Sequence, residues 1–443
     1  MAKLGNIIYY KAVRPIVKIE KLVFGGDGLA RLPDGKVVFV PYSIPGEVLQ
    51  IRITKDYGDY AEAEIDKILE ESTFRRKPIC PYYKICGGCQ LQHITYEAQL
   101  KIKKEILYDT FNRLGWKEDI PLEKIVPSLK EFHYRNRLRL HVENAQLKMG
   151  FVKRKSYEVL KIEKCYLAEG ILNEILSKLY KNPSWVKLSI YSKRVKIESS
   201  PEENKATLIF WTSLKPLEED IEGLIEIKEI KSVFYWMKGR HPEGPFPKGS
   251  SFGGRRVFKN IDSIFYYVQP GVFVQTNWNI NCAIMETIRS WNLDYENVLD
   301  LHAGIGNFIF PLLINKEAKK FLGVDTDLRA IEDGLYIAEK QEINGRLDLR
   351  NMSAMEALYE ALKMGEIYDL VLLDPPRGGC KELLRLLPEV ARKYIIYISC
   401  DAPTFVRDIK ILKEKYDLKK LVLFDMFPQT YHFELVGLLE KKV

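Results

Sequence analysis

A cysteine near the end of the chain is the first residue whose position could support chemistry. Cys400 follows residues 394–398, an aromatic and β-branched run that is typical of a buried strand. Asp401 or Thr404 can cap a helix that we expect to begin directly afterwards. A thiol between the end of a strand and a helix N-terminus is well placed to become a nucleophilic thiolate. The alternative is a cysteine that packs as a small buried hydrophobe.

A carboxylate at the start of an apolar run is the second candidate for chemistry. Glu434 directly precedes residues 435–439, which we expect to form the last strand. Burying a carboxylate there is costly unless it has a partner or a task. Desolvation would raise the pKa of Glu434, as a general base working near neutral pH requires. A strand-end glutamate that faces solvent is the alternative.

Two glycines in the stretch Asp-Leu-His-Ala-Gly-Ile-Gly-Asn, residues 300–307, predict a cofactor loop. Gly304 and Gly306 would let the backbone pass close to a ligand where a Cβ would clash. Asp325 ends the next expected strand, where a carboxylate can accept both hydroxyls of a ribose. A dinucleotide site would prefer a third glycine where this chain has Ile309. The pattern therefore favours S-adenosylmethionine over a dinucleotide.

The fourth strand of this region ends in Asp-Pro-Pro-Arg, residues 374–377. The doubled proline fixes a rigid turn and would hold Asp374 at the mouth of the site. Methyltransferases that act on amino groups place an aromatic residue after the prolines, where this chain has Arg377. A guanidinium at that position can hold a pyrimidine carbonyl or a phosphate.

Four of the seven cysteines are spaced as metal ligands. Cys80, Cys86 and Cys89 leave five and then two residues between them, and Cys165 could complete a set of four sulfurs. Zinc suits four thiolates equally well, and unligated structural cysteines are a third possibility. The spacing differs from the three-then-two arrangement of enzymes that cleave S-adenosylmethionine reductively. An odd number of cysteines without a signal peptide argues against a disulfide framework.

Arginines alternate with other residues between Tyr134 and Leu140. Arg135, Arg137 and Arg139 would therefore share one face of a strand. A basic face with neighbouring aromatic residues suits phosphates and unstacked bases. A solvated edge strand explains the same pattern equally well.

The elements that must position these residues fall into three regions. Strands at 17–24, 37–40, 48–54 and 60–69, separated by glycine-rich turns, predict a small β-barrel. Residues 96–114 predict an amphipathic helix, and 242–254 a long loop. From 262 onwards, beginning with a β-rich run at 265–275, strands and helices alternate. This order predicts a doubly wound α/β sheet with its site at the carboxyl ends of the strands.

Composition limits the classes of protein that fit. The 443 residues predict two or three domains, and the net charge of +8 fits a polyanionic partner. The chain has no apolar run long enough for a transmembrane helix, and its first residues lack the apolar core of a signal peptide. We therefore expect a cytoplasmic protein with no membrane association.

Nearly the whole chain resembles the RNA uracil-5-methyltransferases. Gly-Gly-Asp-Gly-Leu-Ala-Arg, residues 25–31, resembles the TRAM domain, a small OB-like RNA-binding barrel. Cys80-x5-Cys86-Gly-Gly-Cys89 resembles the [4Fe–4S] segment of the family, and only this resemblance favours an iron–sulfur cluster over zinc. The Tyr-Arg-Asn-Arg stretch at 134–137 matches a motif of the family, which favours RNA contacts by Arg135 and Arg137.

The resemblance also implies roles for residues of the expected site. Cys400 would add to carbon 6 of a uracil, and Glu434 would remove the proton from carbon 5 after methyl transfer. Arg377 would contact the substrate. The implied cofactor-binding residues are Gln275, His302, Gly304, Gly306, Asn307, Asp325, Ser353 and Asp374.

The chain departs from the family pattern in two places. His302-Ala303 replaces Phe/Tyr-Cys before the glycines, and Asp401-Ala402-Pro403 replaces Asn-Pro after the nucleophile. Neither departure removes a catalytic atom.

These observations combine into one hypothesis. We expect a TRAM-like barrel at 1–72, a central α+β iron–sulfur region at 73–260 and a Rossmann-like methyltransferase domain at 261–443. The barrel and the cluster together resemble the enzymes that act on 23S ribosomal RNA, because the tRNA enzymes of the family usually lack the cluster. We expect a monomer. The alternatives are a tRNA uracil-5-methyltransferase, a methyltransferase for cytosine or an amino group, and a non-catalytic metal-containing RNA-binding protein.

Overall fold

The computed structural model describes residues 14–143, 148–239, 242–260, 262–313, 319–343 and 345–442. Contacts divide the chain into two compact units. The first comprises Met1–Lys117, Lys153–Ser156 and Phe427–Phe433, and the second Glu118–Val152, Tyr157–Met426 and Glu434–Val443. The expected domain boundaries after residues 72 and 260 stay predictions.

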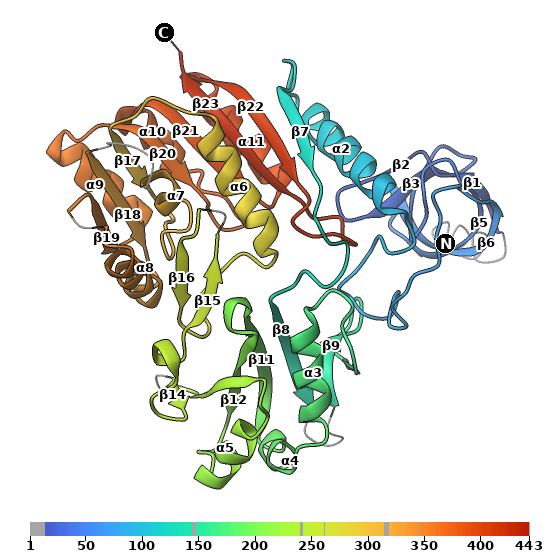
Figure 1. Ribbon diagram of the computed structural model, residues 1–443. Coiled ribbons are helices and arrows are strands. Elements are labelled where there is room, and N and C mark those ends of the chain that lie inside the picture. Colours follow the sequence, from blue (N-terminus) through green and yellow to red (C-terminus); the bar gives the residue numbers. More distant parts are fainter. Residues whose placement is uncertain are drawn as a thin grey trace. The chain divides into compact units, whose positions relative to one another are not determined.

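The first unit contains a six-stranded sheet in the order β1-β5-β6-β4-β3-β2. Its strands are β1 (Ile16–Lys18), β2 (Lys21–Leu22), β3 (Asp27–Arg31), β4 (Val37–Pro41), β5 (Val48–Asp56) and β6 (Tyr60–Glu70). The stretch that forms β1 and β2 pairs with β5 at one end and with β3 at the other, so the two edges of the sheet meet. Figure 1 shows the resulting small barrel in blue, as predicted.

Two details of this barrel differ from the prediction. The strand expected at 17–24 is interrupted between β1 and β2, which allows it to serve both edges of the sheet. Strand β3 was not predicted, because its sequence Asp-Gly-Leu-Ala-Arg begins with turn-forming residues.

The predicted helix at 96–114 is present as α2 (Tyr96–Arg113) in the same unit.

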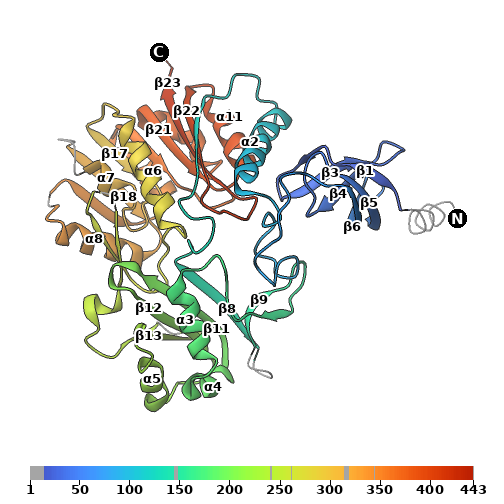
Figure 2. The same cartoon turned by 45° about the vertical axis from the view of Figure 1, so that its right-hand side comes forward.

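The second unit contains a central seven-stranded sheet in the order β10-β9-β8-β11-β12-β13-β14. Its strands are β8 (Arg137–Glu143), β9 (Lys148–Val152), β10 (Val159–Lys161), β11 (Ser192–Ser200), β12 (Lys205–Thr212), β13 (Ile230–Met237) and β14 (Glu243–Phe246). Helices α3 (Gly170–Leu179), α4 (Pro183–Ser189) and α5 (Glu218–Ile225) pack on one face of this sheet (Figure 2). A short 3-10 helix, η1 (Pro201–Glu203), joins β11 to β12.

The link between the central sheet and the last sheet corrects two predictions. The segment expected to be a loop at 242–254 contains β14 and the 3-10 helix η2 (Ser251–Gly254). The β-rich run at 265–275 gives only the short strand β16 (Phe265–Val268), which pairs with β15 (Arg256–Lys259). A proline and a glycine at 270–271 end the strand, so residues 269–277 form a loop.

The last sheet has eight strands in the order β19-β18-β17-β20-β21-β23-β22-β7. Its strands are β17 (Asn297–Asp300), β18 (Lys320–Asp325), β19 (Leu347–Asn351), β20 (Tyr368–Leu373), β21 (Ala391–Ser399), β22 (Tyr416–Phe424), β23 (Glu434–Lys441) and β7 (Leu122–Val126). Neighbouring strands are parallel, except that β23 is antiparallel to both β21 and β22.

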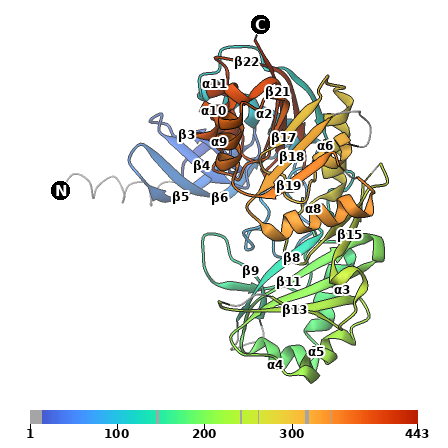
Figure 3. The same cartoon turned by 90° about the vertical axis from the view of Figure 1, so that its left-hand side faces the viewer.

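Helices cover both faces of this sheet. They are α6 (Trp278–Ser290), α7 (Ile309–Leu313), α8 (Leu328–Lys340), α9 (Ala354–Met364), α10 (Leu383–Val390) and α11 (Ala402–Leu412). Helices α9, α10 and α11 lie side by side on one face, and α6 lies on the other (Figure 3). The predicted doubly wound architecture is therefore confirmed.

The eighth strand was not predicted. Strand β7 comes from residues 122–126, far from the other strands in sequence, and pairs in parallel with β22.

In the described part of the chain, no helix is both long and apolar enough to cross a membrane.

Candidate active site

The predicted nucleophile lies where a strand gives way to a helix. Cys400 directly follows β21, and Asp401 caps helix α11 by accepting a hydrogen bond from the Thr404 backbone N–H at 2.9 Å. On the neighbouring strand, Glu434 is the first residue of β23. Ser399 is paired with Leu435, so the Cys400 and Glu434 positions meet at the same end of the sheet.

The surroundings of Cys400 both suppress and support its ionisation. Burial raises the pKa of the Cys400 thiol to about 11, and the nearby Glu434 carboxyl adds to this rise. Arg377 opposes the rise through its charge and through a hydrogen bond to the thiol. The guanidinium is therefore the group of this site that favours the thiolate.

The predicted base is fully enclosed. Glu434 is only 2% exposed, and this burial raises the pKa of its carboxyl well above the usual range. Repulsion from Asp374 raises the pKa further, whereas Arg377 lowers it. Arg377 thus acts on both Cys400 and Glu434, which brings the three residues into one electrostatic cluster.

Helix α11 fixes the loop that carries Arg377. The Thr404 hydroxyl donates a hydrogen bond to the Arg377 carbonyl at 3.1 Å. Arg407, one turn further along the helix, donates from Nη2 to the Gly378 carbonyl at 2.9 Å. The helix that follows Cys400 therefore also positions the loop that carries Arg377.

A buried carboxylate anchors the other end of this loop. Asp408 accepts hydrogen bonds at Oδ2 from the Tyr397 hydroxyl at 2.6 Å and from the Cys380 backbone N–H at 3.3 Å. Its other oxygen pairs with Arg407 at 2.6 Å. Gly379 has φ of +76°, and an added Cβ would collide with the side chains of Thr404, Arg407 and Asp408. Sequence reasoning missed Asp408, since nothing in its local sequence distinguishes it from a surface residue of a helix.

The predicted cofactor loop follows β17. The Gly304 backbone N–H donates to Asp325 Oδ2 at 2.9 Å, so the loop and the end of β18 lie together, as predicted. Gly304 has φ of +54° and open space where a Cβ would stand. Gly306 has φ of +80°, and its Cβ would lie 2.6 Å from the Phe310 ring. The backbone conformation favours glycine at both positions, and at Gly306 a side chain would also clash.

Two buried polar atoms beside this loop have no hydrogen-bond partner among the described residues. Asp300 Oδ1 accepts from the His302 backbone N–H at 3.1 Å, while Asp300 Oδ2 and His302 Nδ1 are unpaired. Burial raises the pKa of Asp300 to about 8 and lowers the pKa of His302 to about 4. Unpaired buried groups are costly, and a bound polar ligand would satisfy them. Asp300 was not predicted as a site residue, although its place before the glycine loop could have indicated it.

Carboxylates gather around this space. Burial and repulsion from Asp325 raise the pKa of Asp374 to about 7. Gln275 Nε2 donates to Asp374 Oδ2 at 3.5 Å, which brings the predicted glutamine to the same place. A ligand that carries positive charge would favour the ionised form of these carboxyl groups.

Two predicted cofactor residues already have structural partners. Asn307 and Asn281 exchange side-chain amide hydrogen bonds of 2.8 and 2.9 Å. Ser353 caps helix α9 and forms a capping box with Glu356. A cofactor-binding role for Asn307 and Ser353 stays a prediction.

The predicted arginine face is only partly open to solvent. Arg137 donates from Nη1 to the Val274 carbonyl at 3.1 Å, and burial lowers its pKa to about 10. The backbone of Arg135 forms isolated β-bridges with Ala168 and Asn277, within the second unit. Tyr134, the aromatic residue next to Arg135, is buried, so its ring is not available to stack on a base. RNA contacts by Arg135 and Arg137 stay a prediction.

The predicted metal ligands are half-buried. Cys80, Cys86 and Cys89 belong to the first unit and Cys165 to the second. Within the described ranges, no three His, Cys, Asp or Glu side chains lie close enough together to hold a metal ion.

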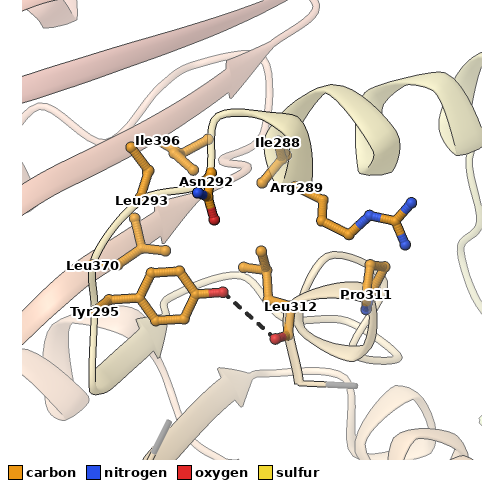
Figure 4. A pocket seen from close by; sticks show the side chains of 9 residues that line it. All are labelled: Ile288, Arg289, Asn292, Leu293, Tyr295, Pro311, Leu312, Leu370 and Ile396. Atoms are coloured by element: carbon orange, nitrogen blue, oxygen red, sulfur yellow. Dashed lines mark hydrogen bonds between the residues drawn. The ribbon is translucent and has the colours of Figure 1, made fainter. Parts of the chain in front are cut away.

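A small pocket of about 90 Å³ lies elsewhere in the second unit (Figure 4). The Tyr295 hydroxyl donates to the Leu312 carbonyl at 3.5 Å beside it. Its other lining residues are Ile288, Arg289, Asn292, Leu293, Pro311, Leu370 and Ile396. None of the predicted site residues lines it, so we assign it no part in the chemistry.

The doubly wound sheet, the glycine loop and the cysteine–glutamate pair fit a methyltransferase of the α/β class. A family model described as tRNA (Uracil-5-)-methyltransferase matches residues 95–442, and a TRAM domain model matches residues 16–65. The chain therefore belongs to the family of RNA uracil-5-methyltransferases. The resemblance recognised from the sequence and the expected TRAM domain are both confirmed.

Curated relatives extend over nearly the whole chain. An uncharacterized RNA methyltransferase of Aquifex aeolicus is 36% identical over 96% of this chain and 98% of its own length. The 23S rRNA (uracil(1939)-C(5))-methyltransferase RlmD of Histophilus somni is 30% identical, with coverage of 96% and 95%. The crystal structure of the Pyrococcus abyssi tRNA (uracil-54, C5)-methyltransferase in complex with S-adenosyl-L-homocysteine shares the fold. It has a TM-score of 0.72 and 24% identity, and the match covers 96% of this chain and 99% of that one.

Proposed function

We propose that this protein methylates carbon 5 of a uridine in 23S ribosomal RNA, with S-adenosylmethionine as the methyl donor. The observation that carries the proposal is the placement of Cys400 and Glu434 at the paired ends of β21 and β23. A thiol and a carboxylate in one cluster with Arg377 are the groups that this reaction needs.

Activation of the uracil begins with Cys400. Its thiolate adds to carbon 6, and the electron pair of the 5,6 double bond moves through carbon 5 onto the oxygen at carbon 4. The resulting enolate makes carbon 5 nucleophilic. Arg377 favours the thiolate before this step, because its charge and hydrogen bond oppose the rise in the pKa of Cys400.

The cofactor supplies the electrophile. S-adenosylmethionine, when bound, provides a methyl group on a positively charged sulfur. The residues that would hold it belong to the glycine loop and the strand ends beside it: Asp300, His302, Gly304, Asp325 and Asp374. Two observations support this assignment. Asp300 and His302 have buried polar atoms without a partner, with which a polar ligand could form hydrogen bonds. The pKa of Asp374 is raised, and a positively charged ligand would stabilise its ionised carboxylate.

Glu434 completes the reaction. After methyl transfer, carbon 5 carries both the new methyl group and a hydrogen. The carboxylate removes this hydrogen as a proton, the double bond reforms, and the bond between carbon 6 and Cys400 breaks to release the thiolate. The raised pKa of Glu434 makes it a stronger base than an ordinary carboxylate.

The choice of RNA rests on the relatives. RlmD proteins of Histophilus somni and Pseudomonas syringae pv. tomato, named for 23S rRNA, are 30% and 31% identical over at least 93% of their length. The family description names tRNA instead. A TRAM domain supports an RNA substrate of either kind.

Methyl transfer to unmodified RNA tests both parts of the proposal. The protein would be incubated with S-adenosylmethionine and, separately, with unmodified ribosomal RNA and tRNA, and the digested nucleosides read by mass spectrometry. We expect 5-methyluridine in the ribosomal sample. Its appearance only in tRNA would overturn the assignment of ribosomal RNA as the substrate. A different methylated nucleoside would overturn the assignment of methylation to carbon 5 of uridine.

We propose separately that Cys80, Cys86, Cys89 and Cys165 hold an iron–sulfur cluster, because Cys80-x5-Cys86-Gly-Gly-Cys89 resembles the [4Fe–4S] segment of the family. The arrangement of the described side chains does not form such a ligand set, so no catalytic step is assigned to a cluster. Anaerobic purification tests the proposal: we expect brown protein that loses its colour in Cys86→Ser. Colourless protein that contains zinc would overturn it.

A further inference from the structure

The central sheet carries a row of basic and aromatic residues across four strands. His141 of β8 is paired with Arg194 of β11. Arg194 is paired on its other side with Trp211 of β12, which is paired in turn with Trp236 of β13. Because directly paired residues project from the same face of a sheet, the four side chains form one continuous row.

This row lies on the face opposite the helices. The adjacent strand positions, Leu140, Val195, Phe210 and Tyr235, are all buried. Trp185 of helix α4 packs against the Phe210 ring, with 5.9 Å between the ring centroids. Since side chains alternate along a strand, the row faces away from α3, α4 and α5, which Figure 2 shows gathered on the other side.

The aromatic half of the row is a preformed stack. The rings of Trp211 and Trp236 are parallel within 5°, with centroids 5.3 Å apart, and both side chains are half-buried. The Arg329 guanidinium lies 5.5 Å from the Trp236 ring. Half-exposed aromatic rings beside a cation provide the surface on which unstacked bases bind.

The basic half of the row concentrates positive charge. Arg139 lies two residues before His141 on the same face of β8, and both Arg139 and Arg194 are exposed. Burial, together with repulsion from these two arginines, lowers the pKa of His141. Within the described residues, no carboxylate forms an ion pair with any of the three. Uncompensated like charges in close proximity favour a polyanionic partner.

We propose that Arg139, His141, Arg194, Trp211 and Trp236 form a platform for a single-stranded segment of the substrate RNA. The tryptophans stack on bases and the arginines bind phosphates. Duplex RNA does not fit this description, because its bases are already stacked on one another. The inference rests on the proposed function, since it assigns a binding surface to the same RNA.

A loop connects this platform with the cofactor site. Gly271 packs against Trp236, where an added Cβ would lie 3.0 Å from the ring. Phe273 is 59% exposed and lies beneath the Arg137 guanidinium, 4.9 Å away. Gln275, two residues further on, contacts Asp374. RNA on the platform would therefore follow this loop towards the residues that we assign to catalysis.

Binding of a fluorescent oligouridylate to the full-length protein tests the platform. The variant Arg139→Gln/Arg194→Gln removes two exposed charges, and Lys363→Gln/Arg385→Gln removes two from helices α9 and α10 as a matched control. We expect the first variant to bind at least about 10-fold more weakly and to lower the slope of log affinity against log salt by about 1.4, at about 0.7 per lost phosphate contact. The control should bind as the unaltered protein does.

The aromatic half has its own test. Trp211→Leu should weaken binding about 5-fold or more, whereas Trp211→Phe should keep most of the affinity because a phenyl ring also stacks. Equal salt slopes for both charge variants, or equally tight binding of a duplex of the same length, would overturn the platform. If the unaltered protein shows the expected binding but forms no 5-methyluridine, the proposed reaction fails and the platform stands.

Discussion

Cys400 and Glu434 stand side by side at the ends of two antiparallel strands, because Ser399 of β21 is paired directly with Leu435 of β23. The proposed nucleophile and the proposed base thus come together through sheet register, although 34 positions separate them. Arg377 acts on both groups from a third segment. The predictions below change one member of this arrangement at a time.

Replacement of the base should trap the reaction at its covalent stage. Glu434→Gln removes the carboxylate that takes the carbon 5 proton, so the thiol cannot leave the methylated base. We expect turnover to fall by about 10²- to 10⁴-fold, and an RNA–protein adduct to accumulate on a denaturing gel. The adduct should be absent in Cys400→Ala. Normal turnover in Glu434→Gln would show that another group removes the proton.

Loss of Arg377 should move the pH profile upwards. The pKa of Cys400 is already raised to about 11 by burial, and Arg377 opposes this rise. In Arg377→Gln the pKa would rise further, leaving less thiolate at neutral pH. We expect kcat/KM to fall about 10-fold or more at pH 7 and to recover partly at higher pH, with Arg385→Gln as the control. A lower rate with an unchanged pH profile would indicate that Arg377 only binds RNA.

The loop that carries Arg377 offers a matched pair of glycines. Gly379 has φ of +76° and lies against Thr404, Arg407 and Asp408, whereas Gly378 has open space around its Cα. Gly379→Ala should displace the loop and lower kcat by about 10- to 100-fold, because small displacements of catalytic groups are costly. Binding of S-adenosylmethionine, measured by calorimetry, should change little. Gly378→Ala should behave as the unaltered protein, and equal losses in both variants would contradict this account.

Buried Asp300 should make the apoprotein less stable as the pH rises. Its pKa is about 8 in the folded protein and about 4 in an unfolded chain, so the folded state binds the extra proton between these values. The contribution of this proton to the free energy of unfolding is complete below pH 4. It decreases by up to about 1.4 kcal/mol per pH unit as the pH approaches 8. Between pH 5 and 8, unfolding by urea should therefore reveal a larger loss of stability in the unaltered protein than in Asp300→Asn. The exposed control Asp119→Asn should follow the unaltered protein, and identical pH dependence in all three would contradict the raised pKa.

Local sequence patterns predicted those features of the candidate site that depend only on neighbouring residues. Cys400 was recognised from the strand before it and the cap after it, and Asp401 does cap α11. Gly304 and Asp325 were recognised from their places at strand ends, and they are hydrogen-bonded to each other. Such features follow from the few residues around them, so the sequence is sufficient to find them.

Features that depend on distant contacts were missed. Strand β7 joins β22 across about 300 residues, which no local periodicity indicates. Asp408 supports the Arg377 loop only because the fold brings Cys380 and Tyr397 to it. The alternation at 134–140 correctly placed Arg137 and Arg139 on one face of β8. It could not indicate that the loop at 269–277 would enclose Arg137 and leave Arg139 exposed.

The central claim is that Cys400 becomes covalently attached to carbon 6 of a uracil. RNA that contains 5-fluorouridine tests it most directly, because Glu434 cannot remove fluorine as it removes a proton. After incubation with S-adenosylmethionine and protease digestion, mass spectrometry should find a methylated fluorouracil nucleotide attached to the peptide that contains Cys400. Attachment to another cysteine, or methylation of ordinary RNA by protein that never forms this adduct, would contradict the account.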